Sequence, residues 1–307
     1  MDRMETRTVS LIGAPTDVGA SVRGAGMGPD ALRVAGLAEA LREHGLAVVD
    51  RGNLAGPPNP GRPPEGGLRH LPEVVAWNRA VHDAVDAALT QGEFPLLMGG
   101  DHCLAVGSIG AIARHCRRRG QSLRVLWLDA HADVNTPGIS PSGNLHGMPV
   151  SCLLGHGPSA LVGWSGAPAA LVPGDIDFIG IRSVDAQEKQ AIRELGLQVF
   201  DMRHIDEHGM RNTMVEALHD IDDNTHLHVS FDLDCLDPAD APGVGTAVRG
   251  GPTYREMQLC MEMVADTGRL SSLDVVELNP ALDVRNRTAE LAVDFIRSLF
   301  GASTLAR

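Results

Sequence analysis

The sequence has 307 residues, of which 39 are Asp or Glu and 26 are Lys or Arg, so its formal net charge is −13. This acidic balance excludes nucleic acid and an anionic membrane surface as expected partners, since both attract basic proteins. The length is sufficient to bury a large α/β core, and no composition break marks a boundary, so we expect one domain over residues 1–307.

Cysteine usage and the absence of long apolar segments predict where the protein resides. The five cysteines are odd in number, widely spaced and without a Cys-x-x-Cys pair, which indicates reduced thiols and a cytoplasmic location. Residues 1–7 lack the apolar stretch of a signal peptide. No segment approaches the ~20 apolar residues of a membrane-spanning helix. We therefore expect a soluble protein that makes no membrane contact.

Apolar runs and helical periodicities alternate along the chain. Short apolar runs predict strands at 8–12, 46–49, 94–98, 124–128, 177–181, 198–200, 226–231 and 272–276. Apolar residues at helical spacing predict helices at 29–44, 74–88, 104–117, 188–195, 214–221, 254–266 and 289–300. The Gly-rich residues 13–28 lack a nucleotide-binding spacing and predict a rim loop, and the Pro- and Gly-rich residues 52–67 predict an exposed excursion. This alternation predicts a three-layer α/β/α sandwich with a mostly parallel central sheet of about eight strands.

Polar side chains follow five of the predicted strands at the point where each strand ends. They are Asp101 and His102, then Asp129, His131 and Asp133, then Arg182 and Asp185, then Asp232 and Asp234, and finally Glu277. Any one of these clusters alone would suit a turn or a helix cap. Ligands of an open parallel sheet, however, bind beyond the carboxyl ends of its strands, so we expect the clusters to converge on one rim. Carboxylates buried together repel one another unless a cation neutralises them.

The converging side chains predict a site for two metal ions. The expected ligands are His102, Asp129, His131, Asp133, Asp232 and Asp234. Four carboxylates match the charge of two divalent cations, and mixed oxygen and imidazole ligation without thiolate favours Mn²⁺ over a structural zinc site. Ligand types alone leave Co²⁺ and Fe²⁺ open. Two cations that share carboxylates lower the pKa of a water between them enough to supply hydroxide, which favours a hydrolase.

Four motifs carry a resemblance to a known family. Gly-Gly-Asp-His at 99–102, Asp-Ala-His-Ala-Asp at 129–133, Ser-Phe-Asp-Leu-Asp-Cys-Leu-Asp-Pro at 230–238 and Glu-Leu-Asn-Pro at 277–280 stand in the order of the ureohydrolases. The resemblance runs from about Val9 to Phe300. Within that superfamily, Ser-Gly-Asn-Leu-His-Gly at 142–147 is similar to the arginase signature rather than to that of agmatinases.

The resemblance implies a cofactor and a reaction. In arginases the first manganese is held by residues matching His102, Asp129, Asp133 and Asp232, and the second by residues matching Asp129, His131, Asp232 and Asp234. It therefore implies two Mn²⁺ per subunit, with Asp129 and Asp232 shared between them. The implied reaction is hydrolysis of the guanidinium group of L-arginine to L-ornithine and urea by the hydroxide that the metal pair activates. A homotrimer or homohexamer is the implied assembly.

The same resemblance assigns roles around the substrate. Glu277 matches the carboxylate that pairs with the guanidinium group, and a bidentate carboxylate fits that planar fork. His146 matches the histidine that moves a proton to the leaving amine. Together with Asp133, these two residues form the expected catalytic set. The expected substrate-binding set comprises Asn135, Ser142 and Asn144 at the α-carboxylate, Asp185 at the α-amino group, and Thr246 and Glu277.

Three departures from the arginase pattern leave alternatives open. Arg-Ser-Val-Asp-Ala-Gln-Glu at 182–188 replaces the common Arg-Asp-Val-Asp-Pro-Gly-Glu, Cys235 stands where Gly is frequent, and Cys103 stands where Ser is usual. None removes a metal ligand, and we expect Cys103 to be a packing change. The alternative enzyme is an agmatinase or guanidinobutyrase-type ureohydrolase. A catalytically idle arginase-like binding protein is a further alternative, which the completeness of the site disfavours.

Overall fold

The fold is built on one parallel sheet. The computed structural model describes residues 7–305. Residues 1–6 and 306–307 lie outside the described residues, and the prediction that residues 1–7 form no signal peptide therefore falls mostly outside them. The strands are β1 (Val9–Gly13), β2 (Val48–Asn53), β3 (Phe94–Met98), β4 (Ser122–Leu128), β5 (Ile176–Ile181), β6 (Gln198–Asp201), β7 (Thr225–Asp232) and β8 (Leu270–Val276). Their order in this eight-stranded sheet is β2-β1-β3-β8-β7-β4-β5-β6, and every adjacent pair is parallel. The predicted α/β/α class and the number of strands are confirmed.

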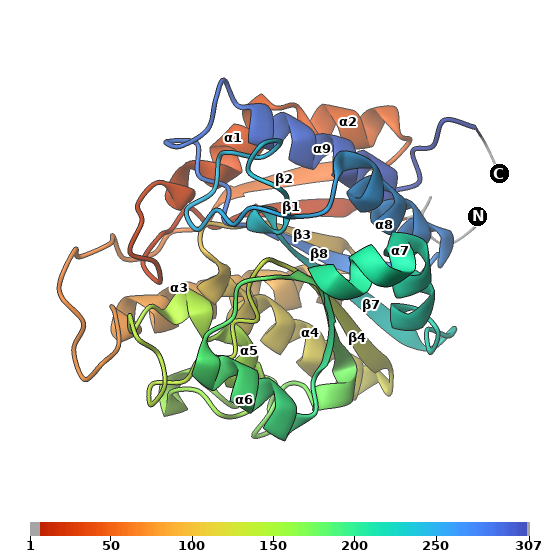
Figure 1. Cartoon of the computed structure of the whole chain (residues 1–307). Coiled ribbons are helices and arrows are strands. Elements are labelled where there is room, and N and C mark those ends of the chain that lie inside the picture. The colour runs from red at the N-terminus through yellow and green to blue at the C-terminus, as the bar shows by residue number, and fades with distance from the viewer. Residues whose placement is uncertain (1–6, 306–307) are drawn as a thin grey trace.

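Helices cover both faces of the sheet, as Figure 1 shows. They are α1 (Gly28–Val34), α2 (Leu37–Glu43), α3 (Leu71–Thr90), α4 (Ala105–Arg119), α5 (Pro149–Leu153), α6 (Ala186–Leu195), α7 (Met202–Ala217), α8 (Tyr254–Asp266) and α9 (Arg287–Leu299). One layer contains α1, α2, α7, α8 and α9, and the other contains α3, α4, α5 and α6. Because both faces are covered, the central strands β3 and β7 bury every residue. No helix in the described part of the chain is long and apolar enough to cross a membrane.

Two helices differ from their sequence predictions. The segment 29–44 forms α1 and α2 rather than one helix, because Gly36 between them adopts a left-handed conformation with φ of 80°. The predicted helix 214–221 is instead α7, which begins at Met202 and ends at Ala217. Asp201 caps its N-terminus by accepting a hydrogen bond from the His204 backbone N–H. The apolar residues in its first half are sparse, so periodicity alone did not locate its start.

The sheet order brings distant parts of the sequence together. Strands β3, β8, β7 and β4 are adjacent in the sheet, and their carboxyl ends lead into the segments that begin at Gly99, Glu277, Leu233 and Asp129. Parallel strands place all these segments at one edge, where an open α/β sheet binds ligands. The single domain over 1–307 stays a prediction, which the continuity of this sheet from β1 to β8 supports.

Candidate metal centre and active site

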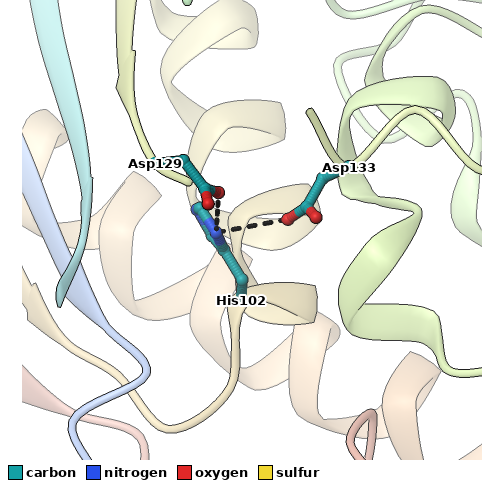
Figure 2. A group of neighbouring side chains, drawn as sticks. All are labelled: His102, Asp129 and Asp133. Carbon is teal, nitrogen blue, oxygen red and sulfur yellow. Dashed lines mark ion pairs between the residues drawn. The ribbon is translucent and has the colours of Figure 1, made fainter. Parts of the chain in front are cut away.

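His102 lies at the centre of a buried group of carboxylates. It follows β3 in a short 3-10 helix, His102–Leu104, whose N-cap Asp101 accepts a hydrogen bond from the Cys103 backbone N–H. Its Nδ1 lies 3.2 Å from Asp129 Oδ2, 3.3 Å from Asp133 Oδ2 and 3.1 Å from Asp232 Oδ2. Figure 2 shows His102 between Asp129 and Asp133, with both carboxylates turned toward its ring. The ring is held in this position by a hydrogen bond between Nε2 and Ser230 Oγ and by stacking on the indole of Trp127.

A second group of ligand atoms shares Asp129 with the first. His131 Nδ1 lies 3.0 Å from Asp234 Oδ2 and 3.5 Å from Asp129 Oδ1. The ligand atoms of His102, Asp129 and Asp133 form one compact set, and those of Asp129, His131 and Asp234 form another. Asp129 presents one carboxylate oxygen to each set, which is the geometry that a bridging ligand requires.

Two residues of the site adopt a strained backbone conformation. Asp133 has φ of 51° and Glu277 has φ of 61°, and both lie in the left-handed region that residues other than Gly rarely adopt. Such strain persists where the surroundings fix a functional side chain. The Glu277 backbone N–H donates to Gly100 O, and Val150 N–H donates to Asp133 O, so each strained residue is held by a backbone bond.

The raised pKa values of residues in the cluster indicate that added positive charge, such as a proton or a metal cation, stabilises it. Burial raises the pKa of Asp133 to about 6, and the Asp129 carboxylate adds to this rise. Burial and two neighbouring carboxylates also raise the pKa of Asp232. Burial opposes protonation of His131, yet the Asp234 and Asp129 carboxylates outweigh it and raise the pKa of this imidazole to about 12.

The residues present fit a pair of divalent cations. His102 Nδ1 is fully buried and accepts or donates no hydrogen bond among the described residues, although three carboxylate oxygens surround it. An imidazole nitrogen in this environment is suited to a cation that the same oxygens also contact. The donor set of carboxylate oxygen and imidazole nitrogen without thiolate is the one that Mn²⁺ and similar metals accept.

A polar pocket has most residues of this cluster in its lining. Its lining comprises His102, His131, Asp133, Asn135, Ser140, Pro141, Ser142, Asn144, His146, Gly147, Ser183, Asp185, Glu188, Asp232, Asp234, Thr246 and Glu277. Among these lining residues, Asp232, Asp234 and Glu277 are buried carboxylates, whereas Ser142 and Asp185 are exposed to solvent. Asn135 Oδ1 is buried without a hydrogen-bond partner among the described residues, so this amide is available to a bound molecule.

Glu277 and His146 form a pair at the pocket wall. Glu277 Oε1 accepts hydrogen bonds from the His102 backbone N–H and from His146 Nδ1, each at 2.9 Å. Burial alone would lower the pKa of His146, but the Glu277 carboxylate outweighs it and raises that pKa to about 9. The backbone N–H of His146 donates to Gly19 O, which fixes the imidazole relative to the rim loop.

The structure brings together all the residues that the sequence singled out for ligation, catalysis and substrate binding. Twelve of the thirteen line the pocket, and Asp129 lies buried immediately behind it. Thr246 lines the pocket and donates to Asp234 Oδ2 at 2.7 Å.

Two polar residues at the strand ends do not belong to this set. Asp101 is fully buried and accepts hydrogen bonds from the backbone of Gly19 and Cys103, and Arg182 donates to five backbone carbonyl groups, so both are structural. Both lie at the same edge of the sheet as the cluster, where backbone groups engage their side chains.

Sequence reasoning missed Glu188. This carboxylate lines the pocket, is 6% exposed, and has its pKa raised to about 7 by burial. Its Oε2 accepts a hydrogen bond from the Asp185 backbone N–H at 3.1 Å, which is one half of a capping box at the start of α6. The spacing Asp-x-x-Glu was the available signal, and it reads equally as a helix cap. Cys103, as expected, is a buried packing residue.

A parallel α/β sheet with a His and Asp cluster at the carboxyl ends of adjacent strands is the architecture of a metal-dependent hydrolase. The model of the arginase family matches residues 7–301. An arginase from Brucella melitensis is 44% identical over 302 residues, which cover 97% of each chain. An arginase from Bacillus caldovelox is 43% identical over 298 residues, covering 96% of this chain and 98% of that one. The crystal structure of arginase from Bacillus cereus superposes with a TM-score of 0.91 at 42% identity, covering 98% of this chain and 100% of that one. The chain belongs to the arginase family.

Proposed function

We propose that this protein hydrolyses L-arginine to L-ornithine and urea. The observation that carries the proposal is the position of Glu277, a buried carboxylate held between His102 and His146 in a pocket that also contains the amide and hydroxyl groups of the 135–144 loop. A substrate with a guanidinium group at one end and a carboxylate at the other matches these two kinds of group. The relatives from Brucella melitensis and Bacillus caldovelox, both named arginase, support the same substrate.

We propose two Mn²⁺ per subunit as the cofactor. One cation would be held by His102, Asp129, Asp133 and Asp232, and the other by Asp129, His131, Asp232 and Asp234. When bound, the pair would supply a water molecule acidified enough to act as a nucleophile near neutral pH. The buried Nδ1 of His102, which three carboxylate oxygens surround, and the two compact sets of ligand atoms support this assignment.

Glu277 orients the reacting group. Its Oε1 is already engaged by His102 N–H and His146 Nδ1, whereas its Oε2 accepts no hydrogen bond among the described residues. Two guanidinium N–H groups can donate to a carboxylate in a planar, paired arrangement, which would fix the face that the guanidinium carbon presents to the cluster. His146 holds a proton at Nδ1 against Glu277 and can release a proton to the departing amine, since a neutral amine leaves more readily than an anion.

The outer pocket binds the rest of the amino acid. Asn135, Ser142 and Asn144 supply amide and hydroxyl groups for the α-carboxylate, and Asp185 supplies a carboxylate for the α-amino group. Glu188 extends this acidic side of the pocket. These contacts lie away from the reacting carbon, so they contribute to binding of substrate and transition state alike.

Location and assembly are part of the same proposal. We propose a cytoplasmic protein, which the five buried, unpaired cysteines support because reduced thiols are usual in that compartment. We propose a homotrimer or homohexamer, which rests on the family resemblance and is tested by light scattering of the purified protein.

A substrate panel tests the proposed reaction. Purified protein loaded with Mn²⁺ should release urea from L-arginine much faster than from agmatine or 4-guanidinobutyrate. Glu277→Gln should abolish nearly all of this turnover while leaving metal content unchanged, because it removes the partner of the guanidinium and no proposed metal ligand. Turnover of agmatine without turnover of L-arginine would refute the substrate assignment. Stoichiometric Mn²⁺ binding without urea from any guanidino compound would indicate the binding-protein alternative.

A further inference from the structure

The Gly-rich turn at residues 65–69 contacts the loop at residues 135–147, which carries the expected α-carboxylate-binding residues and is called the substrate loop below. Glu65 and Leu68 exchange two backbone hydrogen bonds around Gly66 and Gly67, whose φ angles are 58° and 79°, as in a type I′ turn. The next residue, Arg69, donates its backbone N–H to Gly143 O at 2.9 Å. The excursion predicted only as an exposed segment therefore ends in a defined contact with the pocket wall.

Gly143 is required for this contact. A Cβ at Gly143 would lie 2.3 Å from Gly67 O, and the φ of 70° at Gly143 favours glycine independently. The approach places the Arg69 side chain beside Asn144, the next residue along and a lining residue of the pocket. The backbone thus fixes a cation at the rim before any substrate is present.

Two donors hold the Asn144 amide in one orientation. Arg69 Nε and Ser21 Oγ each donate to Asn144 Oδ1 at 2.8 Å. With its oxygen occupied, the amide presents Nδ2, which donates no hydrogen bond to any residue in 7–305, as the group available to the pocket. A hydrogen bond from a guanidinium also polarises the amide, which makes the Nδ2 hydrogens stronger donors toward an anion.

Arg69 carries a charge that no carboxylate neutralises. Among the described residues it forms no ion pair, whereas Arg62 on the same excursion pairs with Glu73 at 2.8 Å. In a chain with a net charge of −13, an uncompensated cation beside a substrate pocket supplies attraction for an anionic group. The carboxylates of the inner pocket attract the opposite end of the same molecule.

We propose that Arg69, supported by Ser21, is a positioning residue that determines specificity for a substrate with an α-carboxylate, by orienting and polarising Asn144. The inference rests on the proposed function and adds to it a residue outside the pocket lining. Removing Arg69 weakens binding of the carboxylate and leaves the chemistry at the guanidinium carbon unchanged, since the guanidinium end binds at the opposite end of the pocket.

Arg69→Met tests the proposal, with Arg62→Met as the matched control on the same excursion. For L-arginine, Arg69→Met should raise KM about tenfold and change kcat by less than about twofold, whereas kcat/KM for agmatine should stay within about twofold. Arg69→Lys should recover part of the loss, because it restores the charge without the planar fork. The Arg62→Met protein should have the wild-type KM and kcat for L-arginine and the wild-type kcat/KM for agmatine.

Inhibition by reaction products gives a readout that does not depend on turnover of agmatine. The inhibition constant of ornithine should rise about tenfold in Arg69→Met, and that of putrescine, which lacks the carboxylate, should not. Equal effects on ornithine and putrescine, or an equal fall in kcat for both substrates, would overturn the inference and indicate a structural role. Failure of the wild type to release urea from L-arginine would instead overturn the proposed function.

Discussion

Replacing Trp127 by Phe tests how the fold positions the ligands of the proposed metal centre. Its side chain is fully buried at the end of β4, stacks on the His102 imidazole with ring centroids 4.0 Å apart, and donates Nε1–H to Asp129 Oδ2 at 2.9 Å. Trp127→Phe keeps an aromatic ring and removes this one donor. The Asp129 carboxylate would then lose a charge-assisted bond that no water can replace at a fully buried position.

The magnitude follows from the charge of the acceptor. A hydrogen bond to a buried charged group contributes about 1.5–3 kcal/mol, and one between neutral groups about 0.5–1.5 kcal/mol. Trp77 supplies the matched control, because it is 4% exposed and donates Nε1–H to the neutral Pro57 O at 2.9 Å. Trp127→Phe should therefore lower the free energy of unfolding of the metal-free protein by about 1 kcal/mol more than Trp77→Phe does.

Metal affinity separates the two variants further. Loss of a group that orients a metal ligand typically weakens binding about 10- to 100-fold. Calorimetric titration with Mn²⁺ should show this loss for Trp127→Phe and wild-type affinity for Trp77→Phe. Equal Mn²⁺ affinity in the wild type and both variants would show that the indole of Trp127 does not position Asp129.

Two further variants test the substrate loop and a buried carboxyl group remote from the site. Asn135→Ala should raise the KM of L-arginine about tenfold with little change in kcat, because its amide binds away from the reacting carbon, and an equal fall in kcat for arginine and agmatine would contradict this role. Burial raises the pKa of the Asp177 carboxyl to about 6, although the Arg124 guanidinium lies 3.1 Å away. The protonated Asp177 therefore contributes to the free energy of unfolding below its unfolded pKa of ~3.9. This contribution is lost as the pH rises through about 6. Relative to the wild type, the free energy of unfolding of Asp177→Asn should therefore increase from about pH 5 to about pH 7 in metal-free protein; a difference that stays constant in urea denaturation would refute this linkage.

The sequence predicts the metal cluster well because its geometry follows from the sheet. Short apolar runs located the strands, and parallel pairing then required His102, Asp129 and Asp232 to meet at one edge. The order β3-β8-β7-β4, which makes the four strands immediate neighbours, is set by long-range packing and is not encoded in any local pattern. The residues that follow the strands were therefore predictable, and their distances were not.

Features that depend on contacts distant in the sequence could not be predicted. Arg69 bonds to Asn144, 75 positions further along the chain, through a segment whose Pro and Gly content predicts only the absence of regular structure. Arg182 occupies a strand end like the ligands do, yet its donors are taken up by backbone carbonyl groups. Glu188 has the spacing of a helix cap, so its exposure to the pocket becomes evident only when α6 is placed beside β5 and the substrate loop.

We propose that six side chains hold two divalent cations on which arginine hydrolysis depends. The most direct test is the Mn²⁺ content of dialysed protein, measured together with urea release from L-arginine, for the wild type and for Asp129→Ala. We predict two Mn²⁺ per chain in the wild type, loss of turnover after chelation, recovery when Mn²⁺ is added back, and loss of one or both cations with nearly all turnover in the variant. Full turnover in chelated wild-type protein, or two tightly bound cations in Asp129→Ala, would contradict this role of the six side chains.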